Sequence, residues 1–123
     1  IVKDDANEII EKMIHTDIWI FATPVYFCSL SAQMKTLIDR MFAREYEIRE
    51  MSRRKKAYLI LTSGSTCQVD MVGAVESFRG FIKVLRTVDE ADIIYGLGAF
   101  EMNDAKNHIA YQKAYELGKN ITL

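Results

Sequence analysis

The chain has 123 residues, of which 50% are hydrophobic and 27% are charged, and its formal net charge at pH 7 is -1. This length fits one domain with a core, and the apolar content excludes the disordered, collagen-like and low-complexity classes. Because the charge is close to neutral, no positive field attracts phosphate backbones or anionic lipids, so neither nucleic acid nor a membrane is expected as a partner.

Cysteines and histidines are few and form no metal-binding pattern. The two cysteines have no short spacing, which indicates reduced thiols in a cytoplasmic protein. No pair of cysteines and histidines has the spacing of zinc ligands, so no metal site is expected within this chain. The apolar runs are far shorter than the roughly 20 residues that span a bilayer, and the first residues lack a signal-peptide pattern.

An amphipathic helix is the first predicted element, over residues 5–15, where apolar residues recur at helical spacing after two acidic residues. A buried strand is predicted over residues 17–23, and the only proline, Pro24, marks its end in a Thr-Pro turn. Ser29 or Ser31 is expected to cap the next helix. The apolar stripe of that helix comprises Leu30, Met34, Leu37, Ile38, Met41 and Phe42.

The second half of the chain predicts two further strands, each followed by a helix. A basic run over residues 49–56 is interpreted as a solvated loop, and "KKAYLILTSGS" predicts a second buried strand with a Gly/Ser turn after it. A helix is expected over residues 69–86, a third strand over 91–100 and a last helix over about 104–120. The inner faces of these helices comprise Val72, Val75, Phe78, Ile82 and Leu85, and then Ala110, Ala114, Leu117 and Ile121.

This order of elements, a helix and then three strand-helix units, predicts the α/β class. Alternating strands and helices require crossover connections, and therefore a parallel sheet with helices on both faces. The first strand is as apolar as a central strand, although only a helix precedes it, so it lacks a neighbour. Either a second chain supplies a strand or the domain is incomplete. Because Ile1 is not an initiator methionine, we expect residues 1–123 to be a single domain that is incomplete at its N-terminus.

Three loops are expected beyond the carboxyl ends of the strands, where ligands bind in open α/β sheets. They read "TPVYFCS", "TSGSTCQ" and "GLGAFEMN". The first two have residues that expose backbone N–H groups or permit close approach, and Tyr26 and Phe27 offer flat apolar surface. Together they predict a site for a planar heteroaromatic ring. By itself, "TSGST" is more typical of an ordinary capped turn between a strand and a helix, and "TPVY" shifts the balance towards a binding site.

The segment "DIWIFATPVYFCSLSAQMKTLIDR" resembles NAD(P)H-dependent FMN reductases and iron-sulfur flavoproteins, and "IIYGLGAFE" and "AYQKAYELGKNI" resemble the last strand and helix of that family. The resemblance implies a flavodoxin-like, three-layer α/β/α fold with five parallel strands in the order 2-1-3-4-5. This chain would hold the last three strands and lack the first two. The loop that grips the FMN phosphate would also lie upstream, as would the cysteine ligands of any iron-sulfur cluster.

The resemblance also implies a function and a set of cofactor-binding residues. The implied function is hydride transfer from NAD(P)H to FMN and then to a quinone, metal, nitro or protein acceptor, in a homo-oligomer. The flavin itself carries the hydride, so no catalytic side chain is implied. Residues placed beside the isoalloxazine ring are Thr23, Pro24, Val25, Tyr26 and Phe27, with Ser63, Gly64, Ser65 and Thr66 in the opposing loop.

Two alternatives to a reductase stay open. One is an electron carrier or binding module without nicotinamide chemistry, as flavodoxins are. The other is a cofactor-free fragment, because without the phosphate loop FMN loses charge-assisted hydrogen bonds of about 1.5–3 kcal/mol each. Packing is the simpler role for Cys28 and Cys67 in the first two loops. Core or interface packing is likewise expected for Tyr95 and Phe100 beside the third loop.

Overall fold

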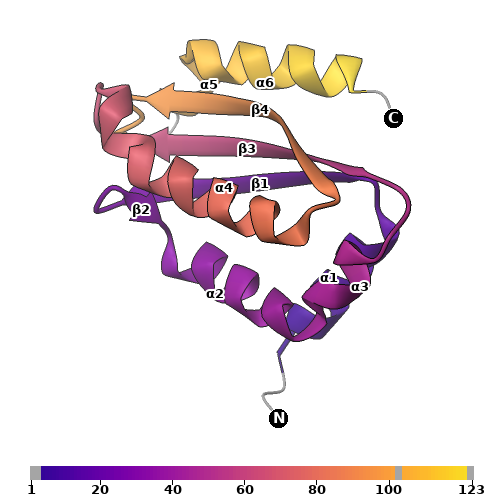
Figure 1. Ribbon diagram of the computed structural model, residues 1–123. Helices are drawn as coiled ribbons and strands as arrows, with labels where there is room; N and C mark the ends of the chain where they lie inside the picture. Colours follow the sequence, from indigo (N-terminus) through magenta and orange to yellow (C-terminus); the bar gives the residue numbers. More distant parts are fainter. Residues whose placement is uncertain (1–3, 102–103, 122–123) are drawn as a thin grey trace.

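The computed structural model describes residues 4–101 and 104–121, and its centre is a sheet in the strand order β2-β1-β3-β4 (Figure 1). The three long strands, β1 (Ile18–Tyr26), β3 (Lys55–Ser63) and β4 (Val88–Leu97), are parallel to one another. This confirms the predicted α/β class and the order of the three strand-helix units. Phe21, Leu59 and Ile93 lie in one row across the sheet.

The first strand is longer than predicted, because it continues through Pro24 and ends at Tyr26. Pro24 pairs in register with Thr62 of β3. A proline is tolerated in an edge strand, where alternate N–H groups face away from the sheet. The turn therefore lies further on, between Tyr26 and the short antiparallel strand β2 (Ser29–Leu30).

On the following segment, Ser31 is the cap of α2 (Ala32–Met41), with its Oγ accepting from Met34 N at 3.3 Å. Leu30, which we placed on the stripe of this helix, belongs to β2 instead. After α2 the chain forms two short elements that the sequence did not predict, η1 (Phe42–Arg44) and α3 (Glu45–Arg49).

Later elements differ from the prediction mainly in their bounds. The helix predicted over residues 69–86 is η2 (Gln68–Met71) followed by α4 (Val72–Leu85). The third strand begins earlier than predicted and ends at Leu97, because Gly98 has a φ of +72°. The last helix is divided at His108 into α5 (Asp104–Asn107) and α6 (Ile109–Asn120). Within the part of the chain that the structure describes, no helix is long and apolar enough to cross a membrane.

The core lies between the sheet and α4, with α1 (Ala6–His15) and α2 on the same side (Figure 1). The ring of Phe21 packs against those of Phe78 and Phe81, with centroids at 5.6 and 5.8 Å. On the opposite face of the sheet, α6 packs against β3 and β4. Ile20 of β1, on that face, is 55% exposed.

The basic run before β3 is a solvated loop only in part. Arg53 and Arg54 are exposed and form ion pairs with Asp17 and Asp89. Lys55, in contrast, is buried, and its Nζ donates to Ile14 O at 2.7 Å and Thr16 O at 2.5 Å. This lysine holds the end of α1 against the start of β3, and burial lowers its pKa.

Candidate functional site

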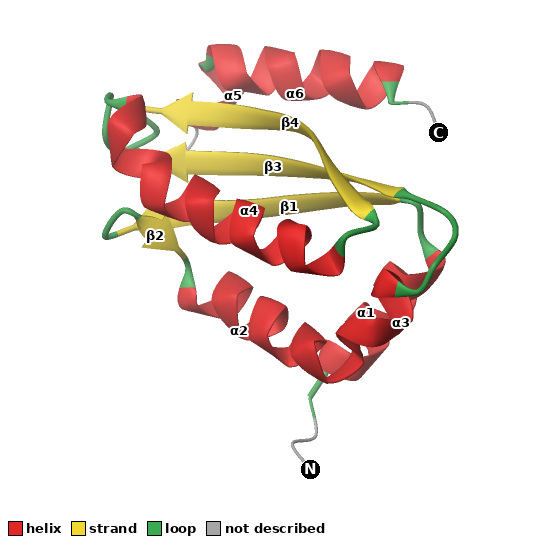
Figure 2. Ribbon diagram, viewed as in Figure 1, coloured by secondary structure: helices red, strands yellow, loops and turns green. Residues whose placement is uncertain are grey.

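The carboxyl ends of β1, β3 and β4 lie at one edge of the sheet, and the three loops identified in the sequence meet there (Figure 2). Parallel strands necessarily bring such loops together, and ligands of open α/β sheets bind at this edge. We call this end of the sheet, beyond the carboxyl ends of the strands, the loop edge. It is formed by the hairpin after β1, the loop after β3 and the loop after β4.

The hairpin between β1 and β2 has a loop of only two residues. Tyr26 pairs with Ser29, so Phe27 and Cys28 alone form the turn, and both have positive φ, at +48° and +60°. Two positive φ angles in a two-residue loop define a type I′ turn, which normally contains Asn and Gly. The Phe27 side chain at the tip is fully exposed.

A buried hydroxyl pair holds the base of this hairpin. Thr23 Oγ1 lies 3.0 Å from Ser31 Oγ and accepts a hydrogen bond from Ser31 N at 3.4 Å. The tip of the hairpin rests on the first turn of α4, where a Cβ built on Gly73 would lie only 2.3 Å from the Cys28 carbonyl oxygen. Only glycine at position 73 permits this close approach.

The loop after β3 is shaped by its own serine hydroxyls. Ser63 Oγ accepts from Ser65 N at 3.1 Å, and Ser65 Oγ accepts from Cys67 N at 3.0 Å while donating to the Asp70 carboxylate. The two residues between them, Gly64 and Thr66, are exposed, and their backbone N–H groups bond to none of the described residues. The loop therefore presents two free backbone donors.

Hydrogen bonds also join the loop after β4 to the loop after β3. Gly98 N donates to Ser65 O at 2.8 Å, and Ala99 N donates to Ser63 O at 2.9 Å. At the base of the loop, His108 Nε2–H donates to Leu97 O while His108 Nδ1 accepts from Ala110 N. The loops after β3 and β4 are therefore bonded directly to each other through their backbones.

Beside the hairpin, the loop edge opens into a groove of about 450 Å³ along the free side of β1. Pro24 and Tyr26 line it from the strand, and Met34 lines it from α2. This groove and the exposed aromatic side chains of the hairpin are the apolar part of the edge, and the free donors of Gly64 and Thr66 are its polar part.

The structure brings the predicted residues to one edge but gives them different positions. Tyr26, Phe27, Gly64 and Thr66 are exposed there. The remaining predicted residues take part in the fold itself: Thr23 is buried, Pro24 and Val25 are partly buried, and the hydroxyls of Ser63 and Ser65 bond within their own loop.

Sequence reasoning missed several residues that shape this edge. Gly73 and His108 gave no signal, since an isolated glycine or histidine in a helical pattern is usually unremarkable. Asp70 lies five residues after Ser65, a spacing that has no motif. Tyr95 packs partly buried against the core as predicted, whereas Phe100 is exposed and lies outside the core, so only the interface part of its expected role stays a prediction.

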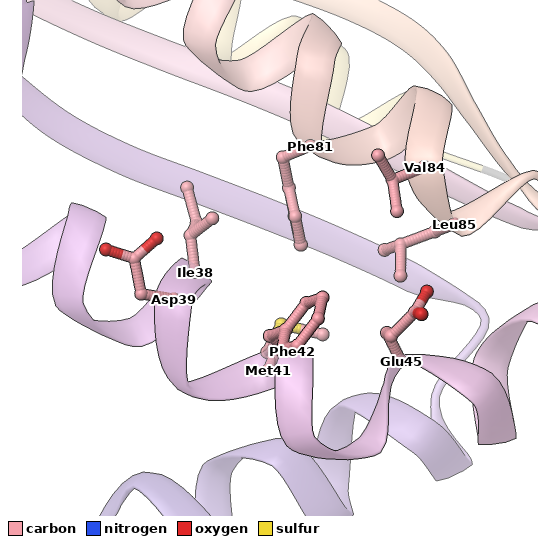
Figure 3. A pocket seen from close by; sticks show the side chains of 8 residues that line it. All are labelled: Ile38, Asp39, Met41, Phe42, Glu45, Phe81, Val84 and Leu85. Atoms are coloured by element: carbon pink, nitrogen blue, oxygen red, sulfur yellow. The ribbon is translucent and has the colours of Figure 1, made fainter.

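A second groove, of about 330 Å³, lies far from the loop edge, between the last turns of α2 and α4 (Figure 3). Its lining is mostly aliphatic and aromatic, and its two carboxylates, Asp39 and Glu45, are bonded to Lys35 and Arg49. Because no free polar group converges on it, this groove is not the candidate site.

The two cysteines at the loop edge are free thiols, and both are exposed rather than buried as expected for packing. Among the described residues, no group of three or more His, Cys, Asp or Glu side chains could hold a metal ion.

Comparison with known proteins identifies relatives of the chain. A family model described as NADPH-dependent FMN reductase matches residues 1–94. The chain is 30% identical over 83 residues to a Bacillus subtilis protein that bears the name NAD(P)H-dependent FMN-containing oxidoreductase, covering 63% of this chain and 46% of the relative. It is also 30% identical over 120 residues to an iron-sulfur flavoprotein of Archaeoglobus fulgidus, covering 97% of this chain and 51% of the relative.

Solved structures support the fold. The Trp repressor binding protein of Bacillus subtilis superposes with a TM-score of 0.77 at 24% identity, covering 94% of this chain and 73% of that one. An NADPH-quinone reductase from P. pentosaceus gives a TM-score of 0.67 at 16% identity, covering 99% and 79%. The chain spans about half the length of the curated relatives that it matches.

Proposed function

Because the chain belongs to the NADPH-dependent FMN reductase family, we propose that its loop edge holds the ring of FMN in an NAD(P)H-dependent oxidoreductase. The onward acceptor in this proposal is a quinone, a metal, a nitro compound or a protein. When bound, FMN supplies the redox chemistry, because its ring accepts hydride and passes electrons on. The protein then has to bind the ring, orient it and keep water from one of its faces.

The free backbone donors at Gly64 and Thr66 are the observation that carries this proposal. The isoalloxazine ring has a polar edge with carbonyl oxygens that accept hydrogen bonds and an apolar edge that fits against aromatic side chains. A site of this kind combines a few fixed polar groups with an apolar wall. Gly64 and Thr66 are suited to the polar edge of the ring, and Tyr26 and Phe27 to its apolar part.

The phosphate of FMN has no comparable match at this edge. The three loops contain no lysine or arginine, and the acidic residues Asp70, Glu101 and Asp104 lie in or beside them. A phosphate group gains most from charged donors and backbone nests. We therefore propose that this chain contacts the ring, and that any phosphate contact belongs to the upstream loop that the family resemblance implies.

The first test separates ring binding from phosphate binding. The chain is titrated into FMN and into lumiflavin, which has the same ring without ribityl phosphate, and flavin fluorescence is followed. Comparable dissociation constants for the two compounds are expected. Binding of neither compound would contradict the proposal, and binding of FMN alone would place the main contact on the phosphate.

The second test addresses the reaction. The flavin-loaded chain is titrated with NADPH under nitrogen, and loss of the flavin absorbance near the visible maximum is the expected result. If NADPH leaves the bound flavin oxidised, but a reduced electron-transfer protein bleaches it, the chain is an electron carrier instead.

A further inference from the structure

Phe100, in the loop after β4, is an exposed aromatic residue with a fixed backbone. Its side chain is 82% exposed. Its N–H lies 3.0 Å from Asp104 Oδ2, which also accepts from Glu101 N at 2.6 Å. The two residues directly before it, Gly98 and Ala99, are bonded to the loop after β3. Single exposed apolar side chains are common on protein surfaces, so the informative feature of Phe100 is not its exposure but the place where its ring lies.

The ring of Phe100 lies against Gly64, at the centre of the loop that presents the free donors. A Cβ built on Gly64 would be 2.6 Å from Phe100 Cδ2 and 3.1 Å from Cε2, and no atom of another residue lies among its three nearest neighbours. The glycine thus allows the ring to rest directly on the backbone. Phe100 is thereby held against the loop that carries the N–H groups of Gly64 and Thr66.

We infer that Phe100 is a ring-binding residue that stacks on, or packs edge-on against, the polar half of the isoalloxazine. This inference rests on the proposed function, since a ring bonded to the donors of Gly64 and Thr66 would lie beside Phe100. Aromatic pairs prefer offset-stacked or edge-to-face geometry, and their contact adds to the gain from burial. The loop after β4 is then part of the site, and Phe100 adds a third aromatic side chain to those of Tyr26 and Phe27.

Alanine and tryptophan variants of Phe100 test the inference, with lumiflavin as the probe. Phe100→Ala is expected to weaken lumiflavin binding about three- to tenfold. Phe100→Trp is expected to restore the affinity and to quench the emission of bound flavin, because a stacked indole quenches it. Phe42→Ala is the matched control: Phe42 is also an exposed phenylalanine, at 76%, but lies in the distant groove of Figure 3. The affinity of Phe42→Ala for lumiflavin should equal that of the wild type.

A double-mutant cycle with Gly64 tests the contact itself. Gly64→Ala should displace the ring of Phe100 and weaken lumiflavin binding, whereas the same change in the Phe100→Ala background should have no further effect, since the cycle then measures a shared contact. If the wild type binds lumiflavin and Phe100→Ala binds it within twofold, the inference is wrong. An equal loss in Phe42→Ala would also overturn it. If the wild type binds no lumiflavin, the proposed function fails.

Discussion

Phe27 and Cys28, at the tip of the hairpin, have a backbone conformation that side chains disfavour. A left-handed conformation costs an L-residue about 1–2 kcal/mol, whereas glycine adopts it freely. The strain is maintained by the paired strands on one side and by contact of the Cys28 carbonyl with Gly73 on the other. It is located where we place the ring, which agrees with the tendency of strained residues to cluster at functional sites.

Cys28→Gly is expected to stabilise the fold. Relief of the left-handed strain outweighs the entropy that glycine adds to the unfolded chain, so the free energy of unfolding should increase by about 0.5–1 kcal/mol. The Cys28 side chain is exposed, so little burial is lost. Urea denaturation at unchanged m-value measures the change. Cys28→Ala keeps a Cβ at positive φ and should give no gain, and equal stabilisation by both variants would contradict this explanation.

Lys55 makes the stability depend on pH at the alkaline end. Burial lowers its pKa in the folded protein, so the unfolded chain binds this proton more tightly. The free energy of unfolding should therefore rise as pH is raised through the window between the lowered pKa and the usual value of about 10.4. Lys55→Met removes this contribution and also leaves Ile14 O and Thr16 O without their donor, at a cost of about 1–3 kcal/mol at neutral pH.

Denaturant unfolding from about pH 8 to pH 10.5 compares the two proteins. The stability difference between wild type and Lys55→Met should widen with pH. A constant difference would mean that Lys55 acts only through its hydrogen bonds and packing.

Two glycines in α4, Gly73 and Gly80, allow a matched pair of alanine substitutions in one helix. At Gly73 a Cβ would meet the backbone of the hairpin at 2.3 Å, whereas at Gly80 nothing lies within 4 Å. Alanine is the better helix former by about 0.8–1.0 kcal/mol, so Gly80→Ala should stabilise the protein by close to that amount. Gly73→Ala should instead destabilise it by about 1–3 kcal/mol, because the hairpin must move. Thermal unfolding of the two variants gives the signs, and a gain in both would show that the hairpin is not held by α4.

The sequence predicted the elements better than it predicted the turns between them. Helical periodicity located α1 and α4, and a continuous apolar run located β3. It failed where a distant contact determines the structure. The sequence predicts that Pro24 ends the strand, but pairing with β3 keeps it in the strand. His108 lies between α5 and α6, where its ring bonds to Leu97 O.

The same distinction applies to the candidate site. The family motif lies at the loop edge, because the motif itself forms the hairpin. It could not reveal that Gly64 and Thr66 keep their N–H groups free while serine hydroxyls occupy those of Ser65 and Cys67. Nor could it place Phe100 on Gly64, since that contact joins loops that lie more than thirty residues apart.

At the scale of the whole molecule, the two edges of the sheet differ in chemistry. The outer strand β4 carries exposed charges at Asp89, Glu90 and Asp92 and a register shift opposite Ala57 and Tyr58. These are the usual protections of a strand edge. The free side of β1 has none of them over the described residues: Ile20 is exposed, and an apolar groove of about 470 Å³ separates the strand from α1 and α2. By its chemistry, β1 is an interior strand.

An unprotected edge of this kind leads to strand pairing, so the chain is expected to self-associate through β1 in solution. Light scattering across a concentration series should show that the wild type associates. Ile20→Lys should reduce this association, because a charged lysine on an edge strand disfavours pairing with a second strand. Val84→Lys is the matched control, since Val84 is 52% exposed against 55% for Ile20 but lies on α4 in the groove of Figure 3. Both variants should retain the circular dichroism of the wild type. If Val84→Lys abolishes association and Ile20→Lys does not, the helical face rather than the strand edge joins the copies, and the open side of β1 needs another explanation.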